Sequence, residues 1–588
     1  MIRMMRFSRR IFAACLLLFS CVAVPAQRLS ADGATQTFQF LADQYFDDVY
    51  FRFAPTAGTS AGFHRYDSSL EDYSAAGVAK EVAALHQWLT KIEAIPADGL
   101  DAPMAADREV LLNSIRSTLL SLETIRMFEK NPDMYSSGVT GSVFTLMERP
   151  YAPVNARLHA VIAREKAMPQ VFAEARKNLK NPPKIYTDIA IEQIDGNISF
   201  FEHDVPLAFA DATDAQAKAE FAKTNAAVID ALKSYGAWLK TDLLPRSDGD
   251  FRFGADTYRK KLLYDEMVDT PLDKLLAVND ANMKANQAEF ARIAKELDPA
   301  KTPQQVLAEL ATIHPAPDKL LDAFRDSFSA EIAFVRSHHI ITIPSDVRPV
   351  LEETPPFMRA TTSASMDSPG PYETGTTKAY FNVTLPEKGW TPEHIAEHMA
   401  EFNVGTIVST SVHEAYPGHY VQFLWQSRFP SKIRKLLGAS SNVEGWAHYC
   451  EQMMLDEGYQ TPGADERTRK LIRLGQLQDA LLRNARFTVG IKMHTEGWTT
   501  EQAEQYFVTE GYQSASVGKM ETKRGTADAT YLYYTLGKLE ILKLRADVKA
   551  KQGAAFTLQG FHDALMQQGP VPIKIVRQAM LHDGSPVL

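Results

Sequence analysis

The stretch SVHEAYPGHY contains the residue types that bind and use a zinc ion: His413 and His419, with Glu414 beside the first. Zinc hydrolases that take two ligands from one helix space them four residues apart, whereas six positions turn the second histidine about 120° away. Pro417 has no N–H, and its ring would clash with the carbonyl of His413, so a helix must open there. Gly418 tolerates an irregular backbone. The pattern predicts either an interrupted helix that brings both histidines together or a helix that simply ends.

The next segment, SNVEGWAHYCEQMM, offers carboxylates for the same site. Glu444 and Glu451 lie seven residues apart, on nearly one face of an expected helix. Zinc hydrolases commonly complete two histidines with a carboxylate from the following helix and leave the fourth position to water. We therefore expect the two histidines and Glu444 to bind one zinc ion, and Glu414 to act as general base on the attacking water. His448 and Glu451 remain alternatives for the third ligand.

Two other short motifs compete with this one. HIAEH carries His394 and His398 at the four-residue spacing of inverted zinc motifs, with Glu397 between them. The alternative for HIAEH is a solvated helix whose histidines face water. GTSAG, at residues 58–62, matches the Gly-x-Ser-x-Gly nucleophile motif, but no strand, sharp turn and helix surround it. Because short motifs often match by chance, both rank below the first motif.

HEAYPGHYVQ and EGWAHYCEQM resemble the two strongest blocks of the bacterial domain of unknown function 885 family, a group of zinc-peptidase-like proteins similar in layout to the thimet oligopeptidase group. Weaker blocks are GFHRYDSSLEDYS, YFNVTLPE and YYTLGKLEILKLR, so the resemblance covers most of the mature chain. It implies that His413, His419 and Glu444 bind zinc and that Glu414 is the base. It also implies that the interrupted helix is a feature of the family, as in dipeptidyl peptidase III, whose motif is similarly lengthened.

The same resemblance implies roles for two residues further along the chain. Tyr534 precedes the Gly-x-Leu-x-Ile block and would donate a hydrogen bond to the developing oxyanion. His494 would do the same or bind substrate. The chain departs from the family pattern at Gly490, where relatives often carry Asp, and at TADAT, which replaces a Pro-Gly-Gln-Ala run. Both departures concern substrate recognition rather than metal chemistry.

Helical periodicity dominates the chain. Apolar residues recur at spacings of three and four, as at Leu112, Ile115 and Leu119, which places them on one face of a helix. Between 340 and 388 six prolines forbid long helices, and AYFNVTL alternates as a strand does. We predict a mainly α protein with a deep cleft and a small β segment around 340–388. The expected parts are a signal peptide (1–26), an N-terminal helical region (27–336) and a catalytic helical region (337–588), the latter two forming one intertwined architecture.

The first 26 residues indicate export. Four arginines precede an apolar run that ends at small residues suited to cleavage. This run is too short to span a membrane, and no later run is longer. We expect a periplasmic or secreted protein, with Cys21 as a candidate lipid-anchor site. Cleavage would leave 59 basic against 72 acidic residues, a formal charge of −13, which disfavours nucleic acid as a partner.

These patterns together predict an exported zinc metallopeptidase of the HExxxGH type that binds one Zn²⁺ per chain and hydrolyses short peptides. A helical shell around a deep cleft would exclude folded proteins. Three alternatives stay open: a zinc hydrolase of non-peptide amides or esters, a periplasmic peptide-binding protein, and a structural zinc site closed by Cys450 or His448. The choice between cleavage inside a peptide and at its ends is left open, as is the oligomeric state.

Overall fold

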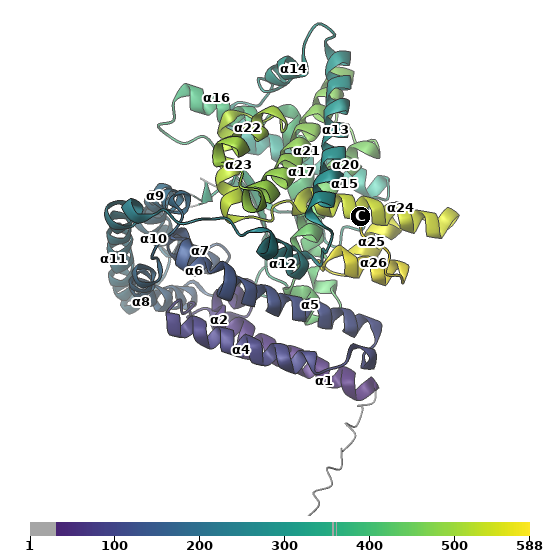
Figure 1. The fold of residues 1–588 in the computed structure, drawn as a ribbon. Helices are drawn as coiled ribbons and strands as arrows, with labels where there is room; N and C mark the ends of the chain where they lie inside the picture. Colours follow the sequence, from purple (N-terminus) through teal and green to yellow (C-terminus); the bar gives the residue numbers. More distant parts are fainter. Residues whose placement is uncertain (1–30, 356–357, 360–361) are drawn as a thin grey trace, which may run out of the picture.

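The protein is mainly helical, and a computed structural model describes residues 31–355, 358–359 and 362–588 (Figure 1). The predicted fold class is confirmed, including the small β segment between 340 and 388. The expected signal peptide and Cys21 lie outside the described residues. Among the helices of the described ranges, none combines the length and the apolar character that crossing a membrane requires.

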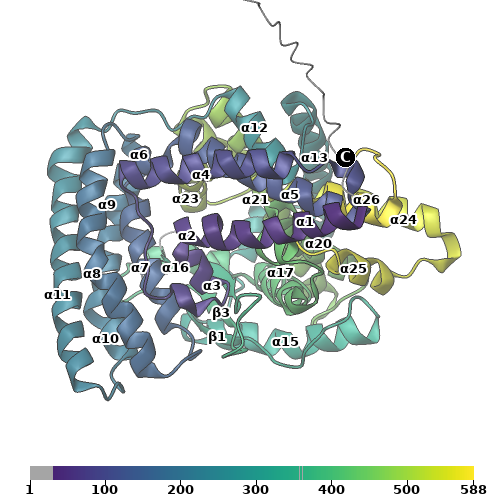
Figure 2. The same cartoon turned by 90° about the horizontal axis from the view of Figure 1, so that it is seen from below.

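The N-terminal half forms two groups of helices. The first group lies along the bottom of Figure 1 and consists of α1 (Ala31–Tyr45), α2 (Phe51–Phe53), α3 (Pro55–Ser60), α4 (Ala75–Glu93) and α5 (Ala102–Leu119). The second group stands side by side at one end of the molecule (Figure 2) and consists of α6 (Met127–Lys130), α7 (Asp133–Met147), α8 (Val154–Asn178), α9 (Lys184–Ser199), α10 (Val205–Ala208) and α11 (Ala215–Trp238). This second group surrounds an apolar core of its own.

The remaining helices surround the region of the metal motif. Those that precede the motif are α12 (Ala255–Glu266), α13 (Leu272–Leu297), α14 (Pro303–Leu310), α15 (Leu320–Ser337) and α16 (Pro392–Glu401). The motif and the segments after it form α17 (Val404–Glu414), α18 (His419–Leu424), α19 (Lys432–Leu436), α20 (Ser440–Asp456), α21 (Glu466–Thr495), α22 (Thr500–Thr509), α23 (Ala515–Ala527), α24 (Tyr533–Gln552), α25 (Leu558–Met566) and α26 (Ile573–Leu581).

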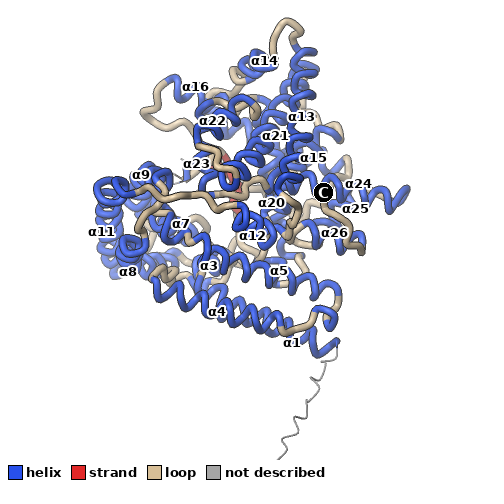
Figure 3. The backbone as a smooth tube through the Cα atoms, in the orientation of Figure 1, coloured by secondary structure: helices blue, strands red, loops and turns tan. Residues whose placement is uncertain are grey.

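A three-stranded sheet fills the segment that prolines keep from being helical (Figure 3). Its strands are β1 (Val350–Glu353), β2 (Ala364–Asp367) and β3 (Tyr380–Val383). The central strand β3 is buried at all four positions, runs parallel to β1 and antiparallel to β2. Within the described residues β2 pairs with β3 alone, so its other edge is open.

The largest apolar core joins the two halves of the chain. It contains Phe38 and Leu111 from α1 and α5 together with Phe324, Tyr449 and Ile541 from α15, α20 and α24. Each of these side chains is at most 1% exposed, and burying one such side chain contributes about 1.5–3 kcal/mol. The first helical group therefore supports the helices of the metal motif directly.

Helices α20 and α24 approach unusually closely at a pair of glycines. A Cβ on Gly445 would lie 2.5 Å from the Cα of Gly537, and a Cβ on Gly537 would overlap the carbonyl oxygen of Ser441. The distance between two packed helix axes depends on the size of the side chains at the contact. Glycine, whose side chain is a single hydrogen atom, allows the closest approach of the two backbones. This contact sets the distance between Glu444 on α20 and Tyr534 on α24.

Gly537→Ala should lower the free energy of unfolding by about 1–3 kcal/mol, because the added methyl group forces the two helices apart. Urea unfolding of the purified protein measures the change. Gly138→Ala is the matched control, since a Cβ there meets nothing within 4 Å and alanine is the better helix former. Equal stability of Gly537→Ala and the unaltered protein would show that the close approach is not required.

Candidate metal centre

The helix of the metal motif is interrupted as the sequence predicts. Helix α17 ends at Glu414 and α18 begins at His419. The N–H of Gly418 donates to the carbonyl of Val412 at 3.0 Å, so the residues between the helices are looped out of the helical path. The ring of His419 thereby returns to within 4.8 Å of the ring of His413, centroid to centroid, and stands perpendicular to it.

Two contacts hold the interruption in place. A Cβ on Gly418 would overlap the carbonyl oxygen of His413, so only glycine allows this close return of the chain. The indole Nε1 of Trp446, on α20, donates to the carbonyl of Pro417 at 3.0 Å. The looped backbone is therefore fixed to the helix that carries Glu444.

His413, His419 and Glu444 form a group that could hold a metal ion. Oε2 of Glu444 lies 3.4 Å from Nε2 of His413 and 3.3 Å from Nε2 of His419. Ligand atoms about 2.0–2.1 Å from a tetrahedral zinc ion lie about 3.4 Å apart, which these separations match. The same Oε2 atom is buried and accepts no hydrogen bond of good geometry from the described residues. The three residues therefore fit zinc.

Glu451, an alternative ligand in the sequence, lies behind the group instead. Its carboxylate accepts from Nδ1 of His413 at 2.7 Å and from Nδ1 of His448 at 3.0 Å. A carboxylate on the far nitrogen of a ligating histidine fixes its tautomer and orientation. Burial lowers the pKa of His413, but Glu444 and Glu451 outweigh burial and raise it to about 9, so metal and proton compete for Nε2.

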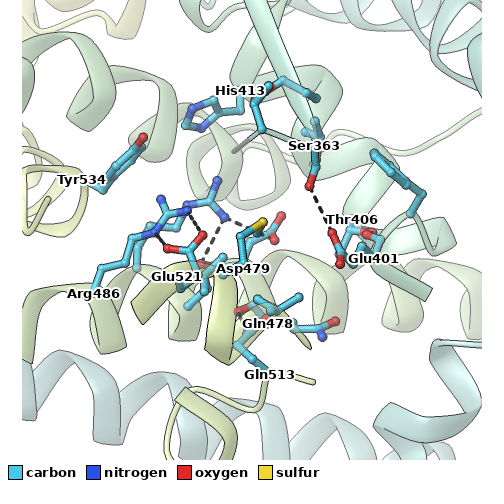
Figure 4. A pocket seen from close by; sticks show the side chains of 18 of the residues that line it. Ser363, Glu401, Thr406, His413, Gln478, Asp479, Arg486, Gln513, Glu521 and Tyr534 are labelled. Carbon is cyan, nitrogen blue, oxygen red and sulfur yellow. Dashed lines mark hydrogen bonds and ion pairs between the residues drawn. The ribbon is translucent and has the colours of Figure 1, made fainter. Parts of the chain in front are cut away.

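A cavity of about 660 Å³ opens onto the group (Figure 4). Glu414 lines this cavity together with both histidines and is 8% exposed. Other walls come from β2, α16, α21 and α23. The cavity corresponds to the cleft that the sequence predicts.

Tyr534 lies in the wall of the same cavity, at the start of α24. Its ring centroid is 6.3 Å from that of His413. The phenolic oxygen accepts a hydrogen bond from Nη2 of Arg524 at 3.0 Å, which leaves the hydroxyl hydrogen free to point into the cavity. Burial and the charge of Glu444 outweigh the neighbouring arginines and raise the pKa of Tyr534, so it stays protonated at neutral pH.

The structure does not bring His494 to the metal group. His494 lies near the end of α21, outside the cavity wall, where its ring packs against Phe251 and Phe253. Its Nε2 bonds the carbonyl of Gly525 at 2.9 Å. The expectation that His494 contacts substrate is therefore corrected. The position of His494 in the sequence did not indicate which face of its helix would line the cavity.

The competing motifs adopt other structures. His394 is exposed and stacks on Trp390 at 3.9 Å, while His398 is buried and bonds the carbonyl of Thr384 at 2.8 Å. The two histidines therefore do not point to a common ion. GTSAG lies at the end of the short helix α3, with Ser60 exposed, and not at a strand-to-helix turn.

Sequence reasoning missed a cluster of arginines beside Tyr534. Arg483 and Arg486 on α21 and Arg524 on α23 all line the cavity (Figure 4 labels Arg486). The spacing of the first two, three residues apart in LLRNARF, was a visible signal that both share a helix face. That α23 would bring a third arginine to the same place depends on packing alone.

His413→Ala should lose nearly all zinc, whereas His394→Ala should keep close to one zinc per chain, because only the first histidine belongs to the metal group. Elemental mass spectrometry on the purified, dialysed proteins measures the content. If His394→Ala lost its zinc and His413→Ala kept it, the zinc site would be the HIAEH motif.

His494 should make stability depend on pH below neutrality. Burial lowers its pKa to about 4, outweighing the bond to Gly525, against about 6.5 in the unfolded chain. Between these values only the unfolded chain takes up the proton, so this contribution is complete above pH 6.5 and is lost as the pH falls towards 4. The stability difference between the unaltered protein and His494→Gln should shrink by about 1.4 kcal/mol per pH unit there. A difference that is constant with pH in urea unfolding would contradict the assignment.

Comparisons with known proteins agree with this architecture. A comparison with curated proteins finds no match. A solved structure described as "a putative lipoprotein of unknown function" from Shewanella oneidensis is 27% identical, with a TM-score of 0.75, over 94% of this chain and 100% of that chain. A "putative lipoprotein" from Colwellia psychrerythraea, 17% identical, shares the fold with a TM-score of 0.77 over 94% of this chain and 99% of its own. The family model described as bacterial protein of unknown function (DUF885) matches residues 55–580, and the chain belongs to that family.

Proposed function

We propose that the protein is an exported zinc metallopeptidase that hydrolyses short peptides, with one Zn²⁺ per chain. The observation that carries this proposal is the group of His413, His419 and Glu444 with Glu414 beside it in the wall of one cavity. Two histidines and a carboxylate leave one position of a tetrahedral ion open, which is the arrangement of catalytic rather than structural zinc sites.

Each residue of the site has a defined part in this reaction. His413, His419 and Glu444 would hold the zinc ion, which would polarise the substrate carbonyl and lower the pKa of the water bound to it. Glu414 takes a proton from the attacking water and passes it to the departing amine. Tyr534 donates its hydroxyl hydrogen to the oxyanion that develops on the carbonyl oxygen. Glu451 holds the ring of His413 with Nε2 facing the cavity.

The open edge of β2 favours a peptide over other substrates. Ser363, Ala364, Ser365 and Met366 line the cavity, and within the described residues this strand has a partner on one side only. An extended peptide can add to such an edge through its backbone N–H and C=O groups. Simple esters and isolated amides lack this repeating pattern of donors and acceptors.

The size of the cavity favours short substrates. Cavities of about 300–1,000 Å³ enclose ligands the size of a drug molecule, and this one has about 660 Å³. Residues of helices α17, α21, α23 and α24 line the cavity. A peptide of a few residues fits such a space, whereas a folded protein cannot present a bond to the metal group.

Export and lipid anchoring are part of the proposal. The arginine-rich apolar start of the chain is typical of a signal peptide, and two proteins of the same fold are each described as a "putative lipoprotein". Cys21 would carry the lipid, which requires cleavage directly before Cys21 instead of after residue 26. The mature protein would then act on peptides outside the cytoplasm.

The structural-zinc alternative is less well supported. Cys450 is buried on α20, but it is not among the residues of the metal group, and burial raises the pKa of its thiol well above the usual range. A protonated thiol is a poor zinc ligand. His448 bonds Glu451 through Nδ1 and is not among the residues of the metal group. Neither residue closes the fourth position.

Glu414→Gln tests the proposal because it removes the base without removing a ligand. The variant should keep its zinc and lose about 100-fold or more of the rate at which a mixture of short peptides is cleaved, followed by mass spectrometry of the products. Glu393→Gln, an exposed position at the start of α16, is the matched control and should cleave normally. Peptide binding without cleavage by the unaltered protein would make it a binding protein, and cleavage of esters alone would make it a different hydrolase.

A further inference from the structure

Three arginines surround the ring of Tyr534. The guanidinium carbons of Arg486, Arg524 and Arg483 lie 4.7, 5.6 and 5.9 Å from the ring centroid. All three line the same cavity as the metal group. The wall next to Tyr534 therefore gathers three guanidinium groups, together with the carboxylates of Asp479 and Glu521, a feature that zinc binding and water activation do not require.

Two of these arginines are already neutralised by carboxylates. Arg486 makes a two-pronged pair with Glu521 at 2.6 and 2.7 Å. Arg483 lies between Asp479, at 3.2 Å, and Glu451, at 3.5 Å. Buried charges need such partners, and these two guanidinium groups have them.

Arg524 is the exception. Its one ion pair within 4 Å among the described residues is with Asp528, at 3.5 Å, whose Oδ2 already accepts from the hydroxyl of Tyr533 at 2.6 Å, while Glu521 attracts it from further away. All guanidinium bonds to the described residues pass through Nη2, the strongest going to Tyr534 at 3.0 Å. The side chain is 31% exposed and lines the cavity, and its Nε and Nη1 make no hydrogen bond to the described residues.

We propose that Arg524 binds the C-terminal carboxylate of the peptide substrate, so that the enzyme releases residues from the C-terminus. An arginine fork matches a carboxylate with two parallel hydrogen bonds. The proposal rests on the peptidase function proposed above. Water adds across the peptide bond: the acyl carbon gains the water oxygen and becomes a new carboxylate, and the C–N bond breaks. The departing residue leaves as an amine that takes up the proton.

The distance to the metal group sets the number of residues released. Arg524 touches the hydroxyl of Tyr534, whose ring lies 6.3 Å from that of His413. An extended residue spans about 3.3–3.6 Å. A carboxylate at Arg524 would therefore place the chain end within a few residues of the bond at the metal group.

The opposite wall is less suited to a free amino terminus. Glu401, at the end of α16, bonds Ser363 across the cavity from Tyr534 (Figure 4). Burial raises the pKa of Glu401 to about 7, so this carboxyl is only partly charged at neutral pH. A neutral carboxyl attracts an ammonium group weakly. Glu397, on the same helix, also lines this wall, so the C-terminal end is favoured by the fork of Arg524 and not by the charge of the opposite wall.

The test compares two forms of one peptide, with a free C-terminal carboxylate or a C-terminal amide. The peptide ends in an apolar residue, because Val517 and Met520 line the cavity on the same helix as Arg524. The unaltered enzyme should have about 10- to 100-fold higher kcat/KM for the free acid, the range expected for one charge-assisted pair. Arg524→Gln should remove this preference, and Arg524→Lys should restore part of it.

Lys523→Gln is the matched control. Lys523 is next in sequence, but it pairs with Glu192 at 2.6 Å and does not line the cavity. This variant should keep the full preference for the free acid. Titration calorimetry in the Glu414→Gln background adds a readout without turnover, in which the acid should bind more tightly than the amide only when Arg524 is present.

Each other outcome overturns the inference in a recognisable way. An equal loss of kcat/KM for acid and amide in Arg524→Gln would make Arg524 a positioning residue for Tyr534. Equal cleavage of both forms by the unaltered enzyme would exclude C-terminal recognition while leaving the peptidase function intact. If cleavage instead depended on a free amino terminus of the peptide, the terminus would be recognised by the opposite wall and not by Arg524. No cleavage and no binding of either form would reject the peptidase function itself.

Discussion

Two carboxylates on one buried helix, Glu444 and Glu451, set the condition that the rest of the site has to meet. Burial raises the pKa of both, but interactions with neighbouring side chains outweigh it and hold each pKa well below its usual range. For Glu444 these groups are His419 and His413, and for Glu451 the largest contribution comes from Arg483. A buried charge without partners costs several kcal/mol, so α20 is stable in place only when α17, α18 and α21 surround it.

The interrupted helix follows from this condition. A regular helix through the motif would turn His419 away from Glu444, which would leave a buried carboxylate facing apolar side chains. The turn at Pro417 and Gly418 brings the second imidazole back, and Trp446 ties the turn to α20. The irregular backbone thus gives the buried carboxylate of Glu444 a second histidine partner, and a bound metal ion would further compensate its charge.

Close packing between helices links the metal group to the wall of the cavity. The glycine contact between α20 and α24 places Tyr534 beside the metal group, and Tyr534 in turn meets Arg524 of α23. The chain of contacts runs from the ligand helix to the wall of the cavity through three helices. A cavity with a metal group, an open strand edge and one weakly paired arginine has different chemistry at each side, which would give a bound peptide the direction proposed above.

Much of this could be predicted from the sequence, because the deciding features are local. Proline and glycine between two histidines impose an interrupted helix wherever the segment lies, and the seven-residue spacing puts Glu444 and Glu451 on one helix face. Helical periodicity likewise predicted the mainly α fold, and proline density together with alternation predicted the position of the small sheet.

Tertiary structure alone decided the rest. Glu444 and Glu451 share a helix face, and only the distance between helices makes the first a candidate ligand and the second the support of His413. Packing also turned His494 away from the cavity and brought Arg524 to it. Sequence spacing determines which face of a helix a residue occupies, whereas the neighbour that this face meets depends on contacts between segments far apart in the chain.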